Sequence, residues 1–419
     1  MSWKRRMRMV ALAVLGLVLA LTPVLVGCGG GEETTEAEIT IGILADFSGA
    51  AAFAVVPTVE AFKESLSYYM EKDPVEGVTI KYVQYDHRLD YSKTVEGYQS
   101  LMAQGMDLFY AMGRTEPDQL STYLVDDQMP TVSTTGRTDK LDFPWLWHPV
   151  PAMTWTTEEI MQWIADDWDG YPTKPKVGHQ GWTLATTDEF QAGIDNVLND
   201  DQWGDKFEWV GVDRATLQNV TWSASYDKFK DCDYIICSAV ANSLATFVSQ
   251  MRALGYDGKF VCGTDQFSGY WALVQKNTPA ADLSGCYYSW WGPYIGQDTD
   301  CDWINELYTY IDENHASDAA ARKASTGPIS GWSTGMVVYE GIAKAAKDVG
   351  ADKTKIDGLA LQAAFNGLEM DLCETGNVLS FAEGCNTGLK ACRIVEWDVA
   401  ASKWKLASEK WYEPLTGCS

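Results

Sequence analysis

Two arginines, Arg114 and Arg137, are the residues of this sequence best suited to hold a charged small molecule. Each follows shortly after a stretch that we expect to be a strand, at 107–112 and at 131–133. A guanidinium group presents a planar fork of N–H donors that matches a carboxylate, so two of them can clamp an acidic ligand. The alternative is that both arginines are solvated or paired with surface carboxylates. The pair, together with the many aromatic residues, points to an acidic or aromatic carboxylate as ligand.

Further polar candidates follow other predicted strands. Ser48 and Gly49 come after the first strand, where glycine permits close backbone approach and serine can donate a hydrogen bond; an ordinary turn is the alternative. Asp265 offers a carboxylate after the strand-like run 259–262, with a helix cap or turn as the alternative role. Trp182 can form an aromatic wall by stacking or cation–π contact. The remaining candidates are Thr115, Thr135, Thr138 and Asn242.

Catalysis and metal binding find little support in the sequence. None of the four histidines stands beside a serine in a nucleophile motif, and no phosphate-binding Gly-x-x-x-x-Gly-Lys occurs. No Cys-x-x-Cys occurs either, and no cysteine and histidine have the spacing of a zinc site. We therefore expect a binding protein without metal or other cofactor. A secreted enzyme built on the same scaffold is the alternative.

The elements that must position the candidates alternate between strands and helices. The first series of strand-like runs comprises 39–44, 78–83, 107–112 and 131–133. The second series, after the proline-containing segment 145–151, comprises 176–179, 207–212, 234–237 and 259–262. Segments with helical spacing separate them, which is typical of βαβ units with a parallel sheet. We expect an α/β fold of two doubly wound Rossmann-like lobes, a second crossover at 285–293, a helix at 332–347, and a final β-meander built from 378–381, 391–399 and 404–406.

The N-terminus has the pattern of an export signal. Four basic residues between positions 4 and 8 precede an uncharged apolar run at 9–26, which ends in Leu25-Val26-Gly27-Cys28. This ending resembles a bacterial lipobox, which implies cleavage before Cys28 and a lipid on its thiol. A plain transmembrane anchor is the alternative, since the run borders on spanning length.

Charge and cysteine content narrow the partners. Segment 1–27 holds four of the 32 basic residues, so the mature chain has 28 against 58 acidic residues, a charge of −30. Such a surface repels nucleic acid and anionic lipid headgroups. Nine cysteines remain after Cys28, which suits an oxidising compartment with some disulfides and at least one unpaired thiol. Cys237 and Cys262 stand in apolar runs and are expected to pack in the core.

The chain resembles the type I periplasmic binding proteins, and within them the branched-chain amino acid and amide receptors of ABC importers. The stretches that carry the resemblance are Ile41-Gly42-Ile43, Phe47-Ser48-Gly49, Asp86, Met129-Pro130-Thr131-Val132-Ser133, Leu254-Gly255-Tyr256, Phe260-Val261-Cys262-Gly263 and Gly331-Trp332-Ser333. The resemblance covers most of the chain from position 39 to about 407. It implies two hinged lobes joined by three crossovers, which close around a ligand without altering it. It also places Arg137 and Thr138 near the carboxylate-binding stretch and Asp265 against a ligand ammonium.

The domain boundaries and partners follow from these two resemblances. We expect a signal peptide at 1–27, a lipid-anchored tether at 28–38, lobe 1 at 39–149 plus 292–368, and lobe 2 at 150–291 plus 369–419. The expected function is that of an extracytoplasmic lipoprotein that binds an amino acid or related small polar molecule, with membrane and ABC permease as partners. A sensor that signals to a membrane kinase or chemoreceptor is the alternative.

Overall fold

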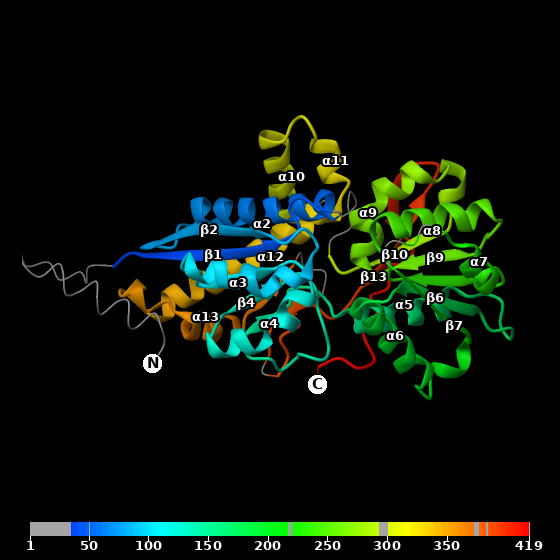
Figure 1. The fold of residues 1–419 in the computed structure, drawn as a ribbon, viewed down its shortest axis with the longest axis horizontal. Coiled ribbons are helices and arrows are strands. Elements are labelled where there is room, and N and C mark those ends of the chain that lie inside the picture. The colour runs from blue at the N-terminus through cyan, green and yellow to red at the C-terminus, as the bar shows by residue number, and fades with distance from the viewer. Residues whose placement is uncertain are drawn as a thin grey trace, which may run out of the picture.

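The computed structural model describes residues 35–49, 51–216, 219, 221–292, 301–372, 377–382 and 384–418, without the side chains of 241 and 264–268. Two lobes lie side by side, each built on its own sheet (Figure 1). We call the five-stranded sheet with its helices lobe 1, and the seven-stranded sheet with its helices lobe 2. The predicted α/β class with two doubly wound halves is confirmed.

Lobe 1 is a parallel sheet with the strand order β2-β1-β3-β4-β5. Its strands are β1 (Ala37–Ala45), β2 (Val78–Asp86), β3 (Leu108–Ala111), β4 (Thr131–Ser133) and β5 (Leu146–Trp147). Its helices are α2 (Ala52–Lys72), α3 (Thr94–Ala103), α4 (Thr115–Asp126), α12 (Thr326–Asp348) and α13 (Gly358–Phe365). The inner strands are almost wholly buried, because helices cover both faces of a parallel sheet.

Helix α12 packs closely along α2, which explains its glycines. A Cβ at Gly331 would lie 2.1 Å from the carbonyl oxygen of Thr58, so only glycine permits this approach. The helix begins at Thr326 rather than at the predicted position 332. Gly331 to Gly335 also matches the spacing Gly-x-Ser-x-Gly of a nucleophile elbow. Ser333, however, lies inside the helix, is 2% exposed and donates to Ser330 O at 3.1 Å, so it is not presented on a strand-to-helix turn.

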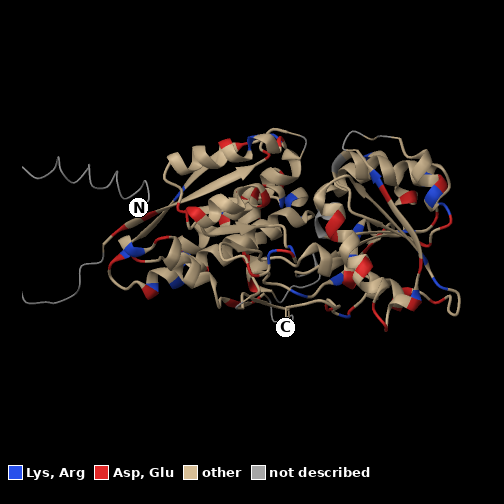
Figure 2. Ribbon diagram, turned by 60° about the horizontal axis from the view of Figure 1, so that its bottom comes forward, with Lys and Arg blue, Asp and Glu red and all other residues tan. Residues whose placement is uncertain are grey.

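Lobe 2 has the strand order β14-β13-β10-β9-β8-β6-β7, with β13 antiparallel to β10. Its strands are β6 (Lys176–Trp182), β7 (Glu208–Ala215), β8 (Tyr234–Cys237), β9 (Lys259–Cys262), β10 (Cys286–Trp290), β13 (Arg393–Asp398) and β14 (Lys403–Leu406). Its helices are α5 (Met153–Asp167), α6 (Ala185–Leu198), α7 (Ser223–Phe229), α8 (Ala241–Ala253) and α9 (Thr264–Asn277). Acidic and basic positions are interspersed over both lobes (Figure 2).

Two expectations about the C-terminal half need correction. Most of the segment expected to cross over at 285–293 forms β10, in the interior of the lobe 2 sheet between β9 and β13, and the crossover begins after it, at Trp291. The expected three-stranded meander is divided, because β12 (Val378–Ser380) pairs with β11 (Glu369–Asp371) in a separate two-stranded sheet. Helices α10 (Asp302–Asn314) and α11 (Ala319–Lys323) project above α2 (Figure 1).

Three segments of chain connect the lobes and are hydrogen-bonded to one another. His148, in the first segment, makes two backbone hydrogen bonds to the third segment. Its N–H donates to Asn386 O at 2.8 Å, and the N–H of Gly388 donates to its carbonyl oxygen at 2.7 Å. The side-chain amide of Asn377 donates to Trp291 O at 3.0 Å and to Ala391 O at 2.8 Å, joining the second segment to the third. The hinge is therefore a bonded strip rather than three independent linkers.

The described cysteines include buried free thiols and disulfide-bonded residues, among them a pair near the end of the chain. Cys385 and Cys418 form a disulfide that fastens the C-terminal tail beside the hinge. Cys237 and Cys262 lie opposite each other in β8 and β9 and are fully buried, which confirms their predicted core packing. Within the described ranges, no helix has the length and apolar character needed to cross a bilayer.

Candidate functional site

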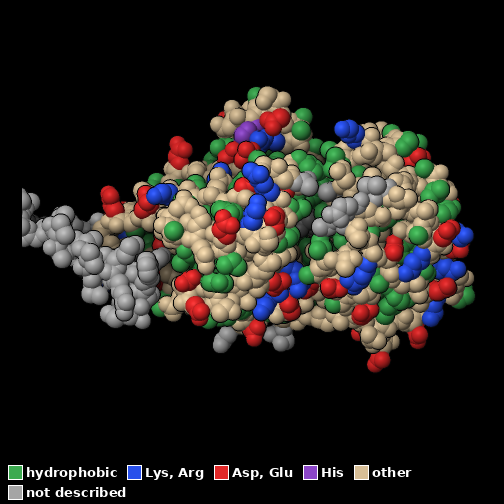
Figure 3. Space-filling model, viewed as in Figure 1, with side chains coloured by type: hydrophobic (Ala, Val, Ile, Leu, Met, Phe, Trp, Pro, Cys, Tyr) green, Lys and Arg blue, Asp and Glu red, His purple; other side chains and the backbone are tan. Residues whose placement is uncertain are grey.

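Three adjoining cavities lie between the lobes. The largest, about 680 Å³, is bordered by the loops after β1, β2 and β3 in lobe 1 and by the loops after β6 and β8 and helix α9 in lobe 2. A second of about 200 Å³ shares Val55, Met112 and Tyr270 with the first. The surface is hollowed between the lobes (Figure 3). The carboxyl ends of parallel strands of both sheets thus converge on one space, which is where such sheets bind ligands.

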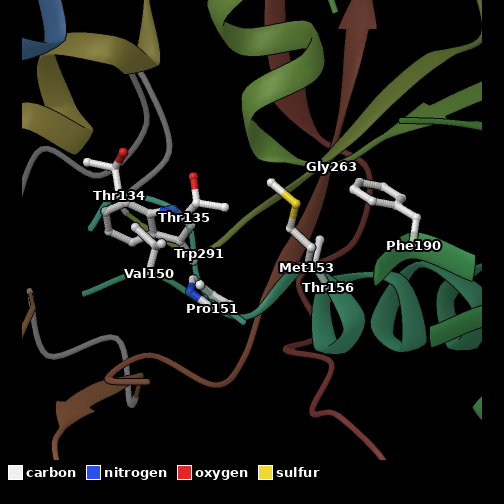
Figure 4. Close-up of a pocket in the computed structure, with 10 residues that line it drawn as sticks. Thr134, Thr135, Val150, Pro151, Met153, Thr156, Phe190, Gly263 and Trp291 are labelled. Atoms are coloured by element: carbon white, nitrogen blue, oxygen red, sulfur yellow. The ribbon is translucent and has the colours of Figure 1, made fainter. Parts of the chain in front are cut away.

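The third cavity is small and reaches the hinge. It shares Thr134 and Met153 with the second and extends to Trp291. Figure 4 shows Thr134, Thr135 and Trp291 on one side, facing Met153 and Phe190 on the other. Thr135, predicted from the sequence as a ligand contact, therefore borders the innermost part of the cleft.

The lobe 1 wall contains a buried histidine–glutamate pair. His87 Nε2 lies 3.0 Å from Glu116 Oε1, and the two side chains are each 2% exposed. The backbone N–H of Leu89 donates to His87 Nδ1 at 3.0 Å, so Nδ1 carries no proton and Nε2–H must donate to the carboxylate. Glu116 Oε2 is buried and has no hydrogen-bond partner among the described residues. His87, Leu89 and Glu116 all border the largest cavity.

A second carboxylate, Asp46, closes the start of α2. Its Oδ1 accepts from Gly49 N at 2.5 Å and its Oδ2 accepts from Ala51 N at 2.8 Å. The free N–H groups at a helix N-terminus attract anions. Because Asp46 lies just before α2, its negative charge disfavours an anionic ligand at this terminus.

The lobe 2 wall is neutral and its hydrogen bonds have a fixed direction. Gln191 Nε2 donates to Asp195 Oδ1 at 2.8 Å, which turns Gln191 Oε1 toward His179 Nδ1, 3.1 Å away. His179 Nδ1 is therefore the donor, and its Nε2 accepts from the Ser238 hydroxyl at 2.9 Å. Burial lowers the pKa of His179 to about 4, so the ring stays neutral.

The same chain of bonds continues toward the cavity through Thr187. Trp182 N–H donates to Thr187 Oγ1 at 2.8 Å, and Thr187 Oγ1 lies 3.1 Å from Ser238 Oγ. Since the Ser238 proton is directed to His179, the Thr187 hydroxyl donates to Ser238. Ser238 and Thr187 both border the cavity, and the Ser238 proton is directed to His179 rather than into the cavity.

Aromatic side chains cover both sides of the largest cavity. Phe53 and Tyr91 belong to lobe 1, while Trp182 and Tyr270 belong to lobe 2. The rings of Phe53 and Tyr270 make an edge-to-face contact across the cleft, with centroids 5.2 Å apart. Burial, followed by the charge of Glu116, raises the pKa of Tyr91, whose phenol therefore stays protonated.

The two arginines of the predicted clamp lie in an ion-pair cluster, which is the alternative role that the sequence left open. Arg137 is 1% exposed and makes two 2.7 Å bonds to Asp139, and it also pairs with Asp118. Arg114 pairs with Glu189 across the lobes and lies 3.4 Å from both Asp118 and Asp139. Three carboxylates thus neutralise two guanidinium groups. Burial opposes ionisation of Asp139, but Arg137 outweighs it and lowers the pKa of that carboxyl.

The other predicted residues are distributed over the cleft and its edges. Trp182 and Asn242 border the largest cavity. Ser48 donates to Asp86 Oδ2 at 2.5 Å and, like Gly49, shapes the loop after β1 without bordering the cavity. The remaining predicted positions are Thr115, at the start of α4, and Thr138, which donates to Thr154 of α5 at 3.2 Å. The side chain of Asp265 and residue Cys28 lie outside the described residues.

Sequence reasoning missed the residues that give the walls their polarity, namely His87, Glu116, His179, Thr187 and Ser238. A signal existed, because each of them stands at or just beyond a predicted strand end. What no spacing revealed is which side chains hydrogen-bond across loops 29 to 59 residues apart. The described residues hold no group of three or more histidine, cysteine or acidic side chains that could bind a metal.

Comparison with known proteins identifies the family. The family model "Periplasmic binding protein" matches residues 38–403, so the chain belongs to the periplasmic binding proteins. These are solute-binding proteins and not enzymes. No curated protein sequence matches the chain.

Solved structures of similar fold cover nearly the whole molecule. A branched-chain amino acid ABC transporter protein from Thermus thermophilus with bound valine has a TM-score of 0.74 at 14% identity, over 91% of this chain and 97% of that one. A fatty acid ABC transporter substrate-binding protein from Thermomonospora curvata has a TM-score of 0.75 at 17% identity, over 92% and 95%. A solute-binding protein from R. palustris in complex with benzoate has a TM-score of 0.69 at 15% identity, over 90% and 97%.

Proposed function

We propose that this member of the periplasmic binding protein family is the extracytoplasmic substrate-binding subunit of an ABC transporter. It would capture an amino acid or a related small polar molecule between its lobes and deliver it to the permease. The observation that carries the proposal is the series of cavities bordered by strand ends of both lobes and limited by the three-segment hinge. Closure adds contacts that exist only with ligand present, so binding shifts the lobes toward the closed state.

The ligand must be deduced from the walls of this cleft rather than from the fold. The names of the similar structures include valine, fatty acid and benzoate, all carried by one architecture. Trp182, Asn242 and Thr135 border the cavities in this chain, and we propose that they contact the ligand. Asp265 stays a candidate at the start of α9.

The anchor belongs to the same proposal. The lipobox-like ending at Cys28 and the tether after it would keep the receptor at the membrane, near its permease, as a lipoprotein with its signal peptide removed. Mass spectrometry of the membrane fraction should find a chain that begins at a modified Cys28. A Cys28→Ala protein that stays in the membrane fraction after processing would contradict the anchor.

The transport proposal is tested by binding and closure together. The purified mature protein is screened by thermal shift against amino acids, amides, amines and carboxylic acids, and each hit is examined by small-angle X-ray scattering. A ligand should raise the melting temperature by mass action and reduce the radius of gyration. Trp182→Ala should weaken binding of that ligand, whereas the matched change Trp168→Ala, at the end of α5, should not. Absence of contraction with every hit would overturn the proposal.

A further inference from the structure

The lobe 1 wall contains a charged acceptor that no group of the described residues satisfies. Glu116 Oε1 is used by His87, whereas Oε2 has no partner among the described residues although the side chain is 2% exposed. A buried carboxylate oxygen without a donor is costly, because it has lost its water without gaining a hydrogen bond. Glu116 borders the 680 Å³ cavity, so a molecule in that cavity is the available source of a donor.

We propose that the ligand of this cleft carries a primary or secondary amine, protonated at neutral pH, whose N–H donates to Glu116 Oε2. This inference rests on the proposed function and specifies the substrate class of the same site. It replaces the carboxylate ligand that Arg114 and Arg137 suggested from the sequence, because those arginines are held by Asp118, Asp139 and Glu189.

The direction of the hydrogen bonds around His87 supports an acceptor role for Glu116. Leu89 N–H donates to His87 Nδ1, so the ring proton is on Nε2 and is given to Oε1. A proton on Glu116 could therefore only be on Oε2. The pair keeps the carboxylate in place and leaves its second oxygen, buried beside the ligand site, without a donor among the described residues.

At two places on the cavity wall, the groups that could meet an anion are already engaged by the protein. The Ser238 proton is given to His179. Asp46 accepts from the N–H groups of Gly49 and Ala51 just before α2, and its charge disfavours an anion there. Arg88 is the one basic residue that borders this cavity in the described chain; its side chain is 67% exposed and lies 3.6 Å from Asp86. The charge balance at the wall is therefore negative.

The aromatic residues suit the same ligand. Tyr91, Phe53, Tyr270 and Trp182 border the cavity from both lobes. The faces of such rings attract organic cations, and the attraction grows as water is removed by closure. An amine with an apolar or aromatic body would thus be held at its charged end by Glu116 and covered by the rings.

The test compares ligands that differ only at the charged end. Phenethylamine, agmatine and putrescine are the amine probes; 2-phenylethanol and 3-phenylpropionate are the neutral and anionic counterparts of the first. Titration calorimetry with the wild-type mature protein should show that at least one of the three amines binds. If phenethylamine binds, its affinity should exceed that of 2-phenylethanol tenfold or more. Binding of the acid but of no amine would overturn the inference and leave the transport proposal intact.

Variants of two glutamates separate charge recognition from general effects. Glu116→Gln keeps the oxygen that accepts from His87 but replaces the other oxygen with an NH₂ donor. It should lower the affinity for the amine at least tenfold, because a charge-assisted hydrogen bond is lost. Glu64→Gln removes the same charge from a second histidine–glutamate pair of lobe 1, with His315 at 2.8 Å, and should leave affinity unchanged. Unchanged affinity in Glu116→Gln would overturn the inference. Failure of every compound class to bind or to contract the wild-type protein would instead overturn the proposed function.

Discussion

The two walls of the cleft each contain a buried histidine, and the two histidines act in opposite directions. In lobe 1, His87 donates its Nε2 proton to a carboxylate, so the wall is charged. In lobe 2, His179 accepts at Nε2 from Ser238, so the wall is neutral. In each case the partner of Nδ1 decides the tautomer: a backbone N–H at His87 and an amide oxygen at His179. A histidine therefore does not by itself define the polarity of a binding wall; the group that is hydrogen-bonded to its Nδ1 does.

The ion pairs of arginines in the two lobes also differ in how far they are buried. Lobe 1 carries the cluster of Arg114 and Arg137, of which the second is nearly inaccessible to solvent. On the lobe 2 sheet, Arg214 makes an exposed pair with Asp188, whereas Arg393 is buried. At the walls of the cleft, we infer that lobe 1 recognises the ligand's charged end and that lobe 2 provides cover. Four predictions can break or sharpen this contrast.

Among the residues of the two walls, the largest effect should come from acid acting on His179 in lobe 2; the hinge histidine His148, whose pKa burial lowers to about 3, adds a loss of its own that the His179 variant leaves in place. Burial lowers the pKa of His179 from the ordinary 6.5 to about 4, so the unfolded chain binds the proton more readily. Its contribution to stability is therefore full above pH 6.5 and is lost as the pH falls toward 4, up to about 3 kcal/mol. Denaturant unfolding at pH 7 and pH 4.5 measures this loss. His179→Gln should reduce the loss of stability between these two pH values, whereas His315→Gln, at a partly exposed site, should leave that loss unchanged. Equal losses in the two variants would contradict the prediction.

The next effect concerns the ion-pair cluster of lobe 1. Arg137→Ala should lower the free energy of unfolding by about 2 kcal/mol, because it leaves Asp118 and Asp139 with Arg114 as their remaining counter-charge in the cluster. The value is below that of a fully buried pair, since both acids are partly exposed. Arg214→Ala, the exposed counterpart in lobe 2, should cost less than about 0.5 kcal/mol. Equal costs for the two variants would remove the contrast between the lobes.

A smaller effect is expected from Ser238, which belongs to the relay, that is, the chain of hydrogen bonds from Thr187 through Ser238 to His179 in the neutral lobe 2 wall. Ser238→Ala removes the donor to His179 Nε2 and should cost about 1 kcal/mol of stability, because a buried acceptor is left unpaired. It should also weaken binding of the ligand that closes the lobes. Ser249→Ala, on the outer part of α8, serves as the matched control in thermal unfolding. A control that loses as much as the variant would show that the relay does not set the polarity of this wall.

The smallest effect is expected where the two walls meet. Glu189→Gln removes the inter-lobe pair with Arg114 and should favour the open state by less than about 1 kcal/mol. The radius of gyration of the unliganded protein should rise slightly, and the change should disappear at high salt. Asp188→Asn, its neighbour, should have no effect on the scattering curve. An unchanged curve in both variants would show that this pair does not hold the lobes together.

Much of the fold was predictable because its signals are local. The strands at Thr131–Ser133, Tyr234–Cys237 and Lys259–Cys262 are observed at the positions that their apolar runs predict. Errors arose where a pairing partner is distant in the sequence: β10 joins β13 across more than one hundred positions, and β12 pairs with β11 rather than with β13. The start of α12 was misplaced because its glycines serve contact with α2, which helix propensity does not report.

The candidate site was only partly predictable. Trp182, Asn242 and Thr135 border the cavities, as their places beyond strand ends suggested. Arg114 and Arg137 stand at similar places, yet carboxylates from α4, α6 and the loop after β4 engage them. Residue type and position near a strand end therefore identify the neighbourhood of the cleft but not which groups are free.

The sequence by itself determined the two-lobed α/β architecture, because the periods of strands and helices are properties of short segments. The tertiary structure alone decided the charge of the binding site. Whether an arginine or a glutamate can meet a ligand depends on which partners have already paired with it, and those partners come from loops and helices far along the chain. In the folded chain, both guanidinium groups are paired with carboxylates, while one oxygen of Glu116 has no donor among the residues that the structure describes.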